Sequence, residues 1–586
     1  MQDDASPRAQ CFPPISASSF ESCLQHAGAT PAEPMQISEL GCPDKPRRLE
    51  DLNDGSDIPQ PARSMQGPAT VQRDQCCSGV QELQTVSSIA ESLPPGTIDW
   101  DLSFPASQTE AITGQKDFQS DVLFVHAIGN LRPQAILPVK DFEWAIRQPD
   151  NILSPHEVMN QNLSLDHLLP IARSAMDVKI VVVLINQFLT QNIDRIQSDL
   201  ADELRRNIDQ EFGKDCHNWQ PVRLLEVMLR VVLRTSARIS WGLPLCRDES
   251  YIRSLTRLIS LHTGAMIMCG QLTPWFLQPL LSIFLRVPLY FVQKRGWAAT
   301  TSLIKEWLAQ IKQEEKEQIS EKDSRVPYNL VTSFIRVSHR LRGSEKLDEG
   351  HLSAFINFFV LLPFMTTVPS ACAAILDIAS SPPEMGLHQQ LRQEAANILS
   401  SEKEWAAPTS FKKLWYTDSA IRETLRLTPA VLHASNREVI HPSGITLPTG
   451  QHLPRGMWVA ASTFDIHTDE KFYPEGQSYK PYRFVEEQTN ENGSGLSGRD
   501  NTQDASMSKQ KMHMVAATST YLPFGSGRHA CPARHFAVHF LKMIVAYIVL
   551  NYDIEHLDKR PDNMIWGEHM LVPPSATVRV RRRKVN

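Results

Sequence analysis

The feature that most constrains this sequence is a cysteine on a glycine-rich loop, placed directly before a long apolar segment. The loop runs from Tyr521 through Gly525 and Gly527 to Cys531, and residues 532–552 are rich in Phe, Leu, Ile and Val. Glycine permits backbone conformations and close approaches that residues with a side chain cannot make. The first amides and the dipole of the predicted helix favour a thiolate at the cysteine. Such a thiolate is suited to be the axial ligand of a haem iron.

The loop resembles the haem-binding signature of the cytochrome P450 family, F-G-x-G-x-[RH]-x-C-x-[GA]. The matching residues are Phe524, Gly525, Gly527, His529, Cys531 and Ala533, the last in place of the more common glycine. The resemblance implies that Cys531 ligates the iron of haem b. It also places His529 beside a haem propionate and Phe524 in the cofactor site.

Two other interpretations of the cysteine are open. Cys531 could be a buried apolar side chain, as most cysteines are. It could also bind zinc together with His535 and His539, because the three recur every fourth residue on one helical face. The zinc hypothesis lacks the glutamate of an H-E-x-x-H motif and leaves the glycines unexplained.

A second pair of motifs lies upstream of the cysteine loop. The pattern predicts a helix over residues 417–427, on which Glu423 and Arg426 share one face and can pair. Alone, this would be an ordinary surface ion pair. In the family the E-x-x-R pair is buried and is completed by the arginine of a P-x-R-F motif, here Arg483 in residues 481–484. The resemblance therefore implies that three interlocked charges support the cysteine loop.

The stretch between these motifs predicts strands and hairpins. Residues 439–459 alternate short apolar runs with Pro and Gly, which is typical of tight turns. By resemblance, Arg437 lies beside a haem propionate, where a guanidinium group suits a carboxylate. The alternative for both Arg437 and His529 is a solvated surface cation.

Residues 353–380 predict a long apolar helix. Its length would admit a membrane span. Pro363 and Asp377 within it, and its position before the E-x-x-R motif, instead favour the buried central helix of the family.

The family's pattern in this helix is [AG]-G-x-[DE]-T-[TS], in which the acid and the threonine relay protons to dioxygen. Residues 362–367 keep the threonine at Thr366, but Met365 replaces the acid and Pro363 the glycine. Proline can open the helix and create a polar gap. The hypothesis is that Thr366, with ordered water or a substrate hydroxyl, delivers the protons. The alternative is a threonine that bonds back to a helix carbonyl.

The resemblance covers residues 94–586 of the 586-residue chain as one domain, mainly α with small β-sheets. The haem would lie between the 353–380 helix and the cysteine loop. Residues 1–93 are rich in Pro, Ser and Gln and predict a disordered segment. Residues 486–519 predict a flexible insertion. Residues 137–154 and 219–251 resemble a fungal secondary-metabolism branch of the family that includes diterpenoid oxidases.

Location and partners are less constrained by the sequence. Residues 1–93 show no signal peptide or membrane anchor, although the resemblance implies the cytosolic face of the endoplasmic reticulum. Residues 272–292 are a candidate surface for peripheral membrane contact, or else core packing over the haem pocket. Their three prolines, one of them Pro288, predict a broken helix. The net charge of −6 gives no reason to expect a nucleic-acid partner.

The expected activity is monooxygenation, the insertion of one oxygen atom from dioxygen into a lipophilic small molecule. The substrate class expected from the resemblance is a terpenoid, a meroterpenoid or another fungal secondary metabolite. Electrons would come from NADPH through a separate flavin reductase, because the chain carries no flavin or dinucleotide motif. Two alternatives are open: a haem-thiolate isomerase or dehydratase, suggested by Met365, and a non-catalytic protein that only binds partners.

Overall fold

The computed structural model describes residues 71–72, 122–126, 132–170, 178–342, 349–485, 514–566 and 568–584. All of them belong to one unit that spans Thr70–Asn586. The predicted disordered segment, apart from Val71–Gln72, and residues 486–513 of the predicted insertion lie outside the described residues.

The described residues are mainly helical, as the sequence predicted. The longer helices are α9 (Ile193–Phe212), α10 (Leu224–Trp241), α11 (Glu249–Met266), α12 (Gln278–Lys316), α13 (Leu330–Arg342), α14 (Glu349–Ala379), α15 (Leu387–Ile398), α18 (Trp415–Leu427) and α22 (Arg534–Asn551). The shorter helices are α4 (Val139–Ala145), α5 (Pro155–Asn162), α6 (Leu165–Leu168), α8 (Val178–Leu184), α16 (Glu402–Trp405), α17 (Pro408–Phe411) and α19 (Thr463–Thr468).

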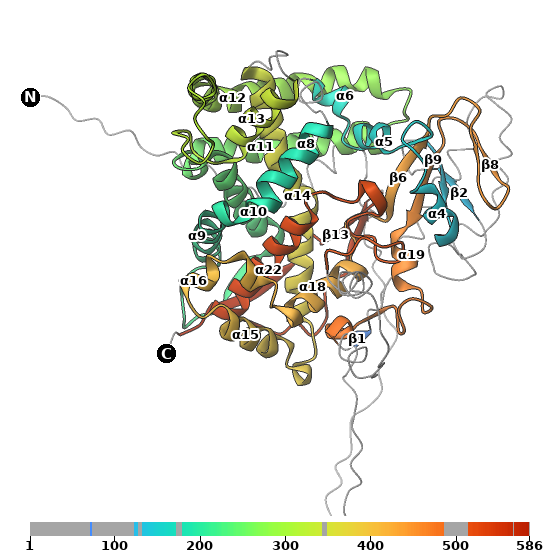
Figure 1. The fold of residues 1–586 in the computed structure, drawn as a ribbon. Coiled ribbons are helices and arrows are strands. Elements are labelled where there is room, and N and C mark those ends of the chain that lie inside the picture. Colours follow the sequence, from blue (N-terminus) through green and yellow to red (C-terminus); the bar gives the residue numbers. More distant parts are fainter. Residues whose placement is uncertain are drawn as a thin grey trace, which may run out of the picture. The chain divides into compact units, whose positions relative to one another are not determined.

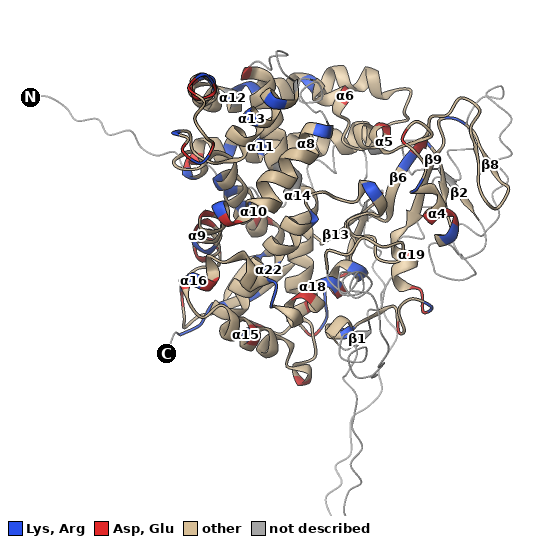
Figure 2. Ribbon diagram, in the orientation of Figure 1, with Lys and Arg blue, Asp and Glu red and all other residues tan. Residues whose placement is uncertain are grey.

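Helix α14 is the predicted central helix, and it begins four residues earlier than the sequence pattern indicated. It packs against α10, α12, α18 and α22, and Figure 1 shows it in the middle of the helical part. Of the helices that the structure describes, α14 is the one long and apolar enough to cross a membrane by length and composition, but 79% of its apolar window is buried in the protein. Figure 2 shows that charges are sparse along α14 and frequent on outer helices such as α9 and α16.

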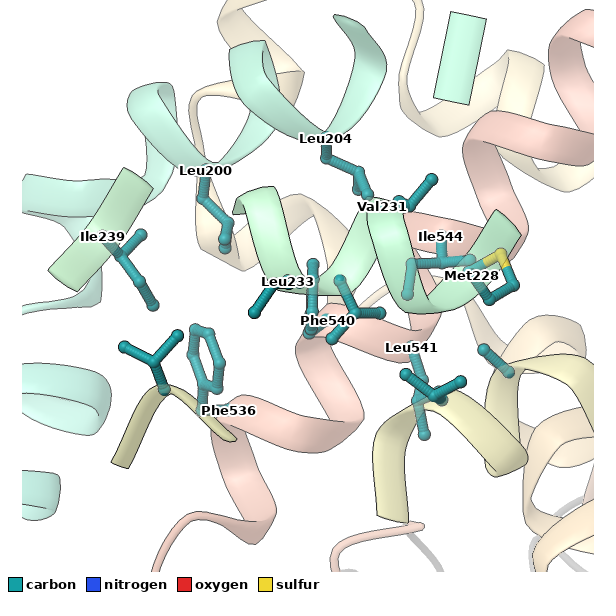
Figure 3. Packing of buried hydrophobic residues seen from close by; sticks show 14 of the residues in the cluster. Leu200, Leu204, Met228, Val231, Leu233, Ile239, Phe536, Phe540, Leu541 and Ile544 are labelled. Atoms are coloured by element: carbon teal, nitrogen blue, oxygen red, sulfur yellow. The ribbon is translucent and has the colours of Figure 1, made fainter. Parts of the chain in front are cut away.

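One large apolar core joins the helices around α14. Figure 3 shows how α22 contributes to it: Phe540 and Ile544 meet side chains of α9 and α10, such as Leu204 and Val231. All four of these side chains are buried. The apolar face of α22 is therefore anchored in the core, which fixes the position of the cysteine loop just before it.

The strands form small sheets. The largest has the order β2-β3-β9-β6-β4, made of Leu123–His126, Pro133–Ile136, Trp458–Ser462, His433–Val439 and Leu153–Ser154, with β3 and β9 parallel and the other pairs antiparallel. The register of β6 on β9 shifts between Ala434 and Arg437, which marks a bulge. The predicted hairpin region contains β7 (Ile445–Thr446) paired with β8 (His452–Leu453).

The remaining sheets are short. A three-stranded sheet has the order β11-β14-β5, made of Tyr552–Ile554, Thr577–Arg582 and Gln220–Arg223. Two further pairs join β12 (Met564–Trp566) to β13 (His569–Leu571) and β1 (Val71–Gln72) to β10 (Ser478–Tyr479).

The expectation of a broken helix in residues 272–292 is correct for residues 272–277, which are not helical, but wrong for the part that contains Pro288. Helix α12 is 39 residues long and is not interrupted at Pro288. Pro279 lies in its first turn, where proline is tolerated. An internal proline costs a helix roughly 3 kcal/mol or more. Packing of α12 against α11 and α14 offsets this cost.

Candidate functional site

The cysteine loop is a tight turn closed by backbone hydrogen bonds. The Cys531 amide donates to the Phe524 carbonyl over 2.8 Å, and the Gly525 amide donates to the Leu522 carbonyl over 2.9 Å. Gly525 and Gly527 have φ angles of 69° and 70°, in the left-handed region that favours glycine. The requirement for glycine at both positions of the motif therefore follows from the fold of the loop.

A serine on β6 holds the loop from the other side. The Ser526 amide donates to the Ser435 hydroxyl over 3.0 Å. Ser435 lies in the β6 bulge with φ of 56°, an uncommon conformation for a residue with a side chain. A Cβ at Gly525 would stand 3.2 Å from the same hydroxyl, which leaves little room for a larger residue there.

Cys531 lies three residues before α22 and is partly exposed. Burial of its sulfur raises the pKa of the thiol, while the amides of Ala533 and Arg534 and the charge of Arg534 lower it. The amides at the start of the helix thus lower the pKa of the thiol, as the sequence suggested, but burial raises this pKa by more. The surrounding protein alone does not hold the thiolate, and deprotonation would come from coordination to a metal.

The three charges of the upstream motifs are brought together in the interior. Arg426 and Glu423 form a bidentate pair with contacts of 2.7 and 2.8 Å, and the Arg483 Nε donates to the same carboxylate over 3.1 Å. Glu423 and Arg426 are fully buried and Arg483 is nearly so. The pairing predicted from the sequence is present, and we call these residues the buried triad.

Arg437 is buried and has hydrogen-bond donors that a carboxylate could satisfy. Its side chain is 1% exposed, yet its Nε and Nη1 have no hydrogen-bond partner among the described residues, and only Nη2 donates, to the Ile146 carbonyl over 3.3 Å. Burial, followed by the nearby Arg528, lowers the pKa of Arg437 to about 10. A buried guanidinium with two unpaired donors fits an anionic group such as a haem propionate.

His529 meets a carboxylate of the protein itself. Its Nε2 lies 2.8 Å from Asp150, and Arg528 pairs with the same carboxylate over 2.7 Å. Asp150 was not singled out by the sequence, because no motif links it to the cysteine loop. Whether His529 also reaches a propionate remains a prediction.

Thr366 is exposed although it lies within the core helix α14, whereas Thr367 and Val368 beside it are buried. Met365 is partly exposed. Helix α14 is continuous through Pro363, so the opening of the helix expected at this proline is not present. An accessible threonine on a core helix fits a bound group or substrate beside that helix.

The structure does not support the zinc interpretation. The Nε2 of His539 lies 2.8 Å from the amide oxygen of Gln197, inside the core. Within the described part of the chain, no group of three His, Cys, Asp or Glu side chains could hold a metal ion.

Comparison with known proteins decides the family. The model of the cytochrome P450 family matches residues 182–580. The chain belongs to the cytochrome P450 family. The predicted fold, mainly helical with small β-sheets, and the predicted class of oxidoreductase are thereby confirmed.

Several fungal relatives cover most of the chain. The cytochrome P450 monooxygenase polB of Polytolypa hystricis is 33% identical over 77% of this chain and 84% of its own length. The monooxygenase efuH of Hormonema carpetanum is 33% identical over 76% of this chain and 77% of its own length. The monooxygenase nodZ of Hypoxylon pulicicidum is 30% identical over 77% of this chain and 82% of its own length.

The family implies haem, and the residues present fit it. Cys531 would ligate the iron, Arg437 would bind a propionate, and Phe524 packs at the edge of the core beside the loop. The sequence identified these residues through the family signature. It missed Asp150, Ser435 and His467, whose contacts join segments far apart in the chain.

We expect Arg437→Leu to weaken haem retention by roughly tenfold or more, because a charge-assisted hydrogen bond contributes about 1.5–3 kcal/mol. The haem-free variant should melt at the same temperature as the haem-free wild type or higher, since the substitution removes a buried, unpaired charge. Haem transfer to apomyoglobin and thermal melting measure the two effects. Arg455→Leu, at an exposed arginine, is the control. Unchanged haem transfer from Arg437→Leu would contradict the assignment.

Proposed function

We propose that this cytochrome P450 is a monooxygenase of fungal secondary metabolism that acts on a lipophilic molecule of the terpenoid or meroterpenoid class. The observation that carries the proposal is the Cys531 loop, held in a tight turn before α22 by its own backbone and by the Ser435 hydroxyl of β6. The relatives named as monooxygenases support the reaction type. The substrate class rests on the resemblance of residues 219–251 to the branch with diterpenoid oxidases.

When bound, a haem with a thiolate ligand activates dioxygen for insertion of one oxygen atom into a substrate. The protein's own residues would hold the ligand and supply protons. Met365 cannot give up a proton, because a thioether carries none. The Thr366 hydroxyl is accessible on α14 and can donate a proton at its Oγ1. Electrons would come from NADPH through a separate flavin reductase, because this sequence contains no motif that binds a flavin or a dinucleotide.

The experiment uses purified holoenzyme with a P450 reductase, NADPH and a panel of terpenoid and meroterpenoid substrates under isotope-labelled dioxygen. A product that carries one labelled oxygen atom supports the proposal. Conversion to an unlabelled isomer or dehydration product would overturn it in favour of the alternative that the missing acid at Met365 suggests. Oxygenation confined to substrates outside these classes would overturn the substrate assignment alone. A reduced carbon-monoxide complex without a thiolate-type Soret band would favour the non-catalytic alternative.

We expect Thr366→Ala to uncouple oxygen consumption from product formation, because the Thr366 hydroxyl is exposed on α14, whereas that of Thr367 is buried and Met365 carries no transferable proton. General acid groups typically contribute 10²–10⁴-fold, and we expect a loss of coupling of at least about tenfold. The ratio of product formed to NADPH consumed measures it. Thr367→Ala, at the buried neighbouring threonine, is the matched control. Full coupling in Thr366→Ala would show that protons arrive by another route.

Peripheral membrane contact through residues 272–292 is part of the proposal. Apolar side chains on one face of α12 are exposed, among them Phe284 (69%) and Phe291 (65%), whereas Leu289 on the other face is buried. These exposed side chains do not take part in core packing. Residues 272–305 contain no Asp or Glu but include Arg286, Lys294, Arg295 and Lys305. An apolar face flanked by cations suits the surface of an anionic bilayer, and we propose the cytosolic face of the endoplasmic reticulum.

The double variant Phe284→Ser with Phe291→Ser should bind vesicles containing an anionic phospholipid at least tenfold more weakly than the wild type. Full burial of one Phe side chain contributes roughly 1.5–3 kcal/mol. Vesicle flotation measures the difference. Ile565→Ser removes an exposed apolar side chain of β12 and is the control. Equal flotation of the double variant and the wild type would rule out this face as the contact.

A further inference from the structure

His467 occupies an unusual position between the buried triad and the cysteine loop. It lies on α19 and its side chain is fully buried. Its Nδ1 lies 2.9 Å from the Arg426 carbonyl, and its Nε2 accepts the Leu522 amide over 2.8 Å. Because a carbonyl can only accept, Nδ1 carries the proton, and both ring nitrogens are satisfied.

Hydrogen bonds connect His467 to the buried triad on one side and to the cysteine loop on the other. On one side, Arg426 donates from its Nη1 to the His467 carbonyl, so the residue is joined to the triad through its main chain and its ring. The Arg426 carbonyl is in the last turn of α18, where carbonyls have no partner within the helix. On the other side, the Leu522 carbonyl accepts from Gly525, and the Phe524 carbonyl accepts from Cys531.

We propose that His467 is a positioning residue that transmits the rigidity of the buried triad to the cysteine loop and so fixes the sulfur of Cys531 for coordination. Among the residues that the structure describes, no hydrogen bond joins the triad directly to the loop backbone. The imidazole ring provides a hydrogen-bonded path from Arg426 to Leu522, and from Leu522 the two turn hydrogen bonds reach the Cys531 amide.

The surroundings of the ring suit this role. The imidazole stacks on Tyr521, with ring centres 5.6 Å apart and planes 20° apart, and meets the edge of Tyr473. Burial lowers the pKa of His467 to about 3, and the charges of Arg426 and Arg422 act in the same direction, although the bond to the Arg426 carbonyl raises it. The ring therefore stays neutral across the working range of pH, and Nε2 remains an acceptor for Leu522.

The test compares two substitutions in the full-length holoenzyme. His467→Leu fills the space but leaves the Arg426 carbonyl and the Leu522 amide unpaired. His467→Gln offers one donor and one acceptor on a side chain of similar reach. The exposed His217 provides the control, His217→Leu. Three properties are measured: the fraction of thiolate-type Soret band in the reduced carbon-monoxide complex, the haem reduction potential, and the rate of haem transfer to apomyoglobin.

We expect His467→Leu to lose most of the thiolate-type band, to shift the haem potential upward and to release haem about tenfold faster. His467→Gln should recover most of the wild-type spectrum and potential, and His217→Leu should match the wild type. A wild-type spectrum and potential in folded His467→Leu would overturn the proposal, as would equal impairment of the Leu and Gln variants.

Should His467→Leu fail to fold, His467→Met replaces it in the same comparison, because Met is apolar, flexible and adaptable in a core. Recovery in His467→Gln beside failure of both apolar variants supports the role of the two hydrogen bonds. Failure of His467→Gln as well would overturn it. The substrate is not needed for any of these measurements, so their outcome is independent of the proposed reaction.

Discussion

Cys531→Ser should abolish both the thiolate-type Soret band and turnover. Serine has nearly the same size but its hydroxyl is a far weaker ligand for a haem iron than a thiolate, whose electron donation favours O–O cleavage. The loop itself should persist, because its closing bonds come from backbone groups of Leu522, Phe524, Gly525 and Cys531 and do not involve the sulfur. We therefore expect a folded protein with product formation reduced to background.

The measurement combines the carbon-monoxide difference spectrum, haem content per protein and product formation with thermal melting. Cys216→Ser is the matched control, because Cys216 is a partly exposed free cysteine outside the site. It should keep the spectrum and the activity of the wild type. A variant at Cys531 that retained the thiolate-type band would show that another side chain holds the iron, and the assignment of the site would be wrong.

The sequence was most informative where the chemistry restricts residue types within a short segment. Gly525 and Gly527 stand at positive φ, which few other residues tolerate, so the loop leaves a recognisable pattern around Cys531. Glu423 and Arg426 are three residues apart on α18, so their pairing follows from helix geometry alone. The third member, Arg483, was found only through the family's motif, since it lies 60 residues from Glu423.

Contacts between segments that lie far apart in the chain could not be predicted from the sequence. His467 lies 41 residues from Arg426 and 55 from Leu522, and a single histidine on a short helix carries no spacing that predicts either partner. Asp150 is 379 residues from His529. The course of α12 through Pro288 was also missed, because local propensity favours a break there and only tertiary packing outweighs it.

The buried triad should be the most sensitive structural element of the site. Glu423→Ala would leave Arg426 and Arg483 in the interior without their shared carboxylate. Removing one partner of a buried ion pair typically costs about 3–5 kcal/mol, a large part of the roughly 5–15 kcal/mol that stabilises a domain. We expect Glu423→Ala to accumulate poorly, and the protein that does fold to retain little haem.

Glu402→Ala is the matched control for this prediction. Glu402 also forms a bidentate pair with an arginine, Arg205, but its side chain is 79% exposed. An exposed pair contributes about 0–1 kcal/mol, so the control should unfold at nearly the wild-type denaturant concentration. Chemical unfolding of the haem-free proteins separates the loss of stability from the loss of cofactor. If the two variants were equally stable, burial would not be what makes the triad important, and its role would have to lie in the haem-bound state alone.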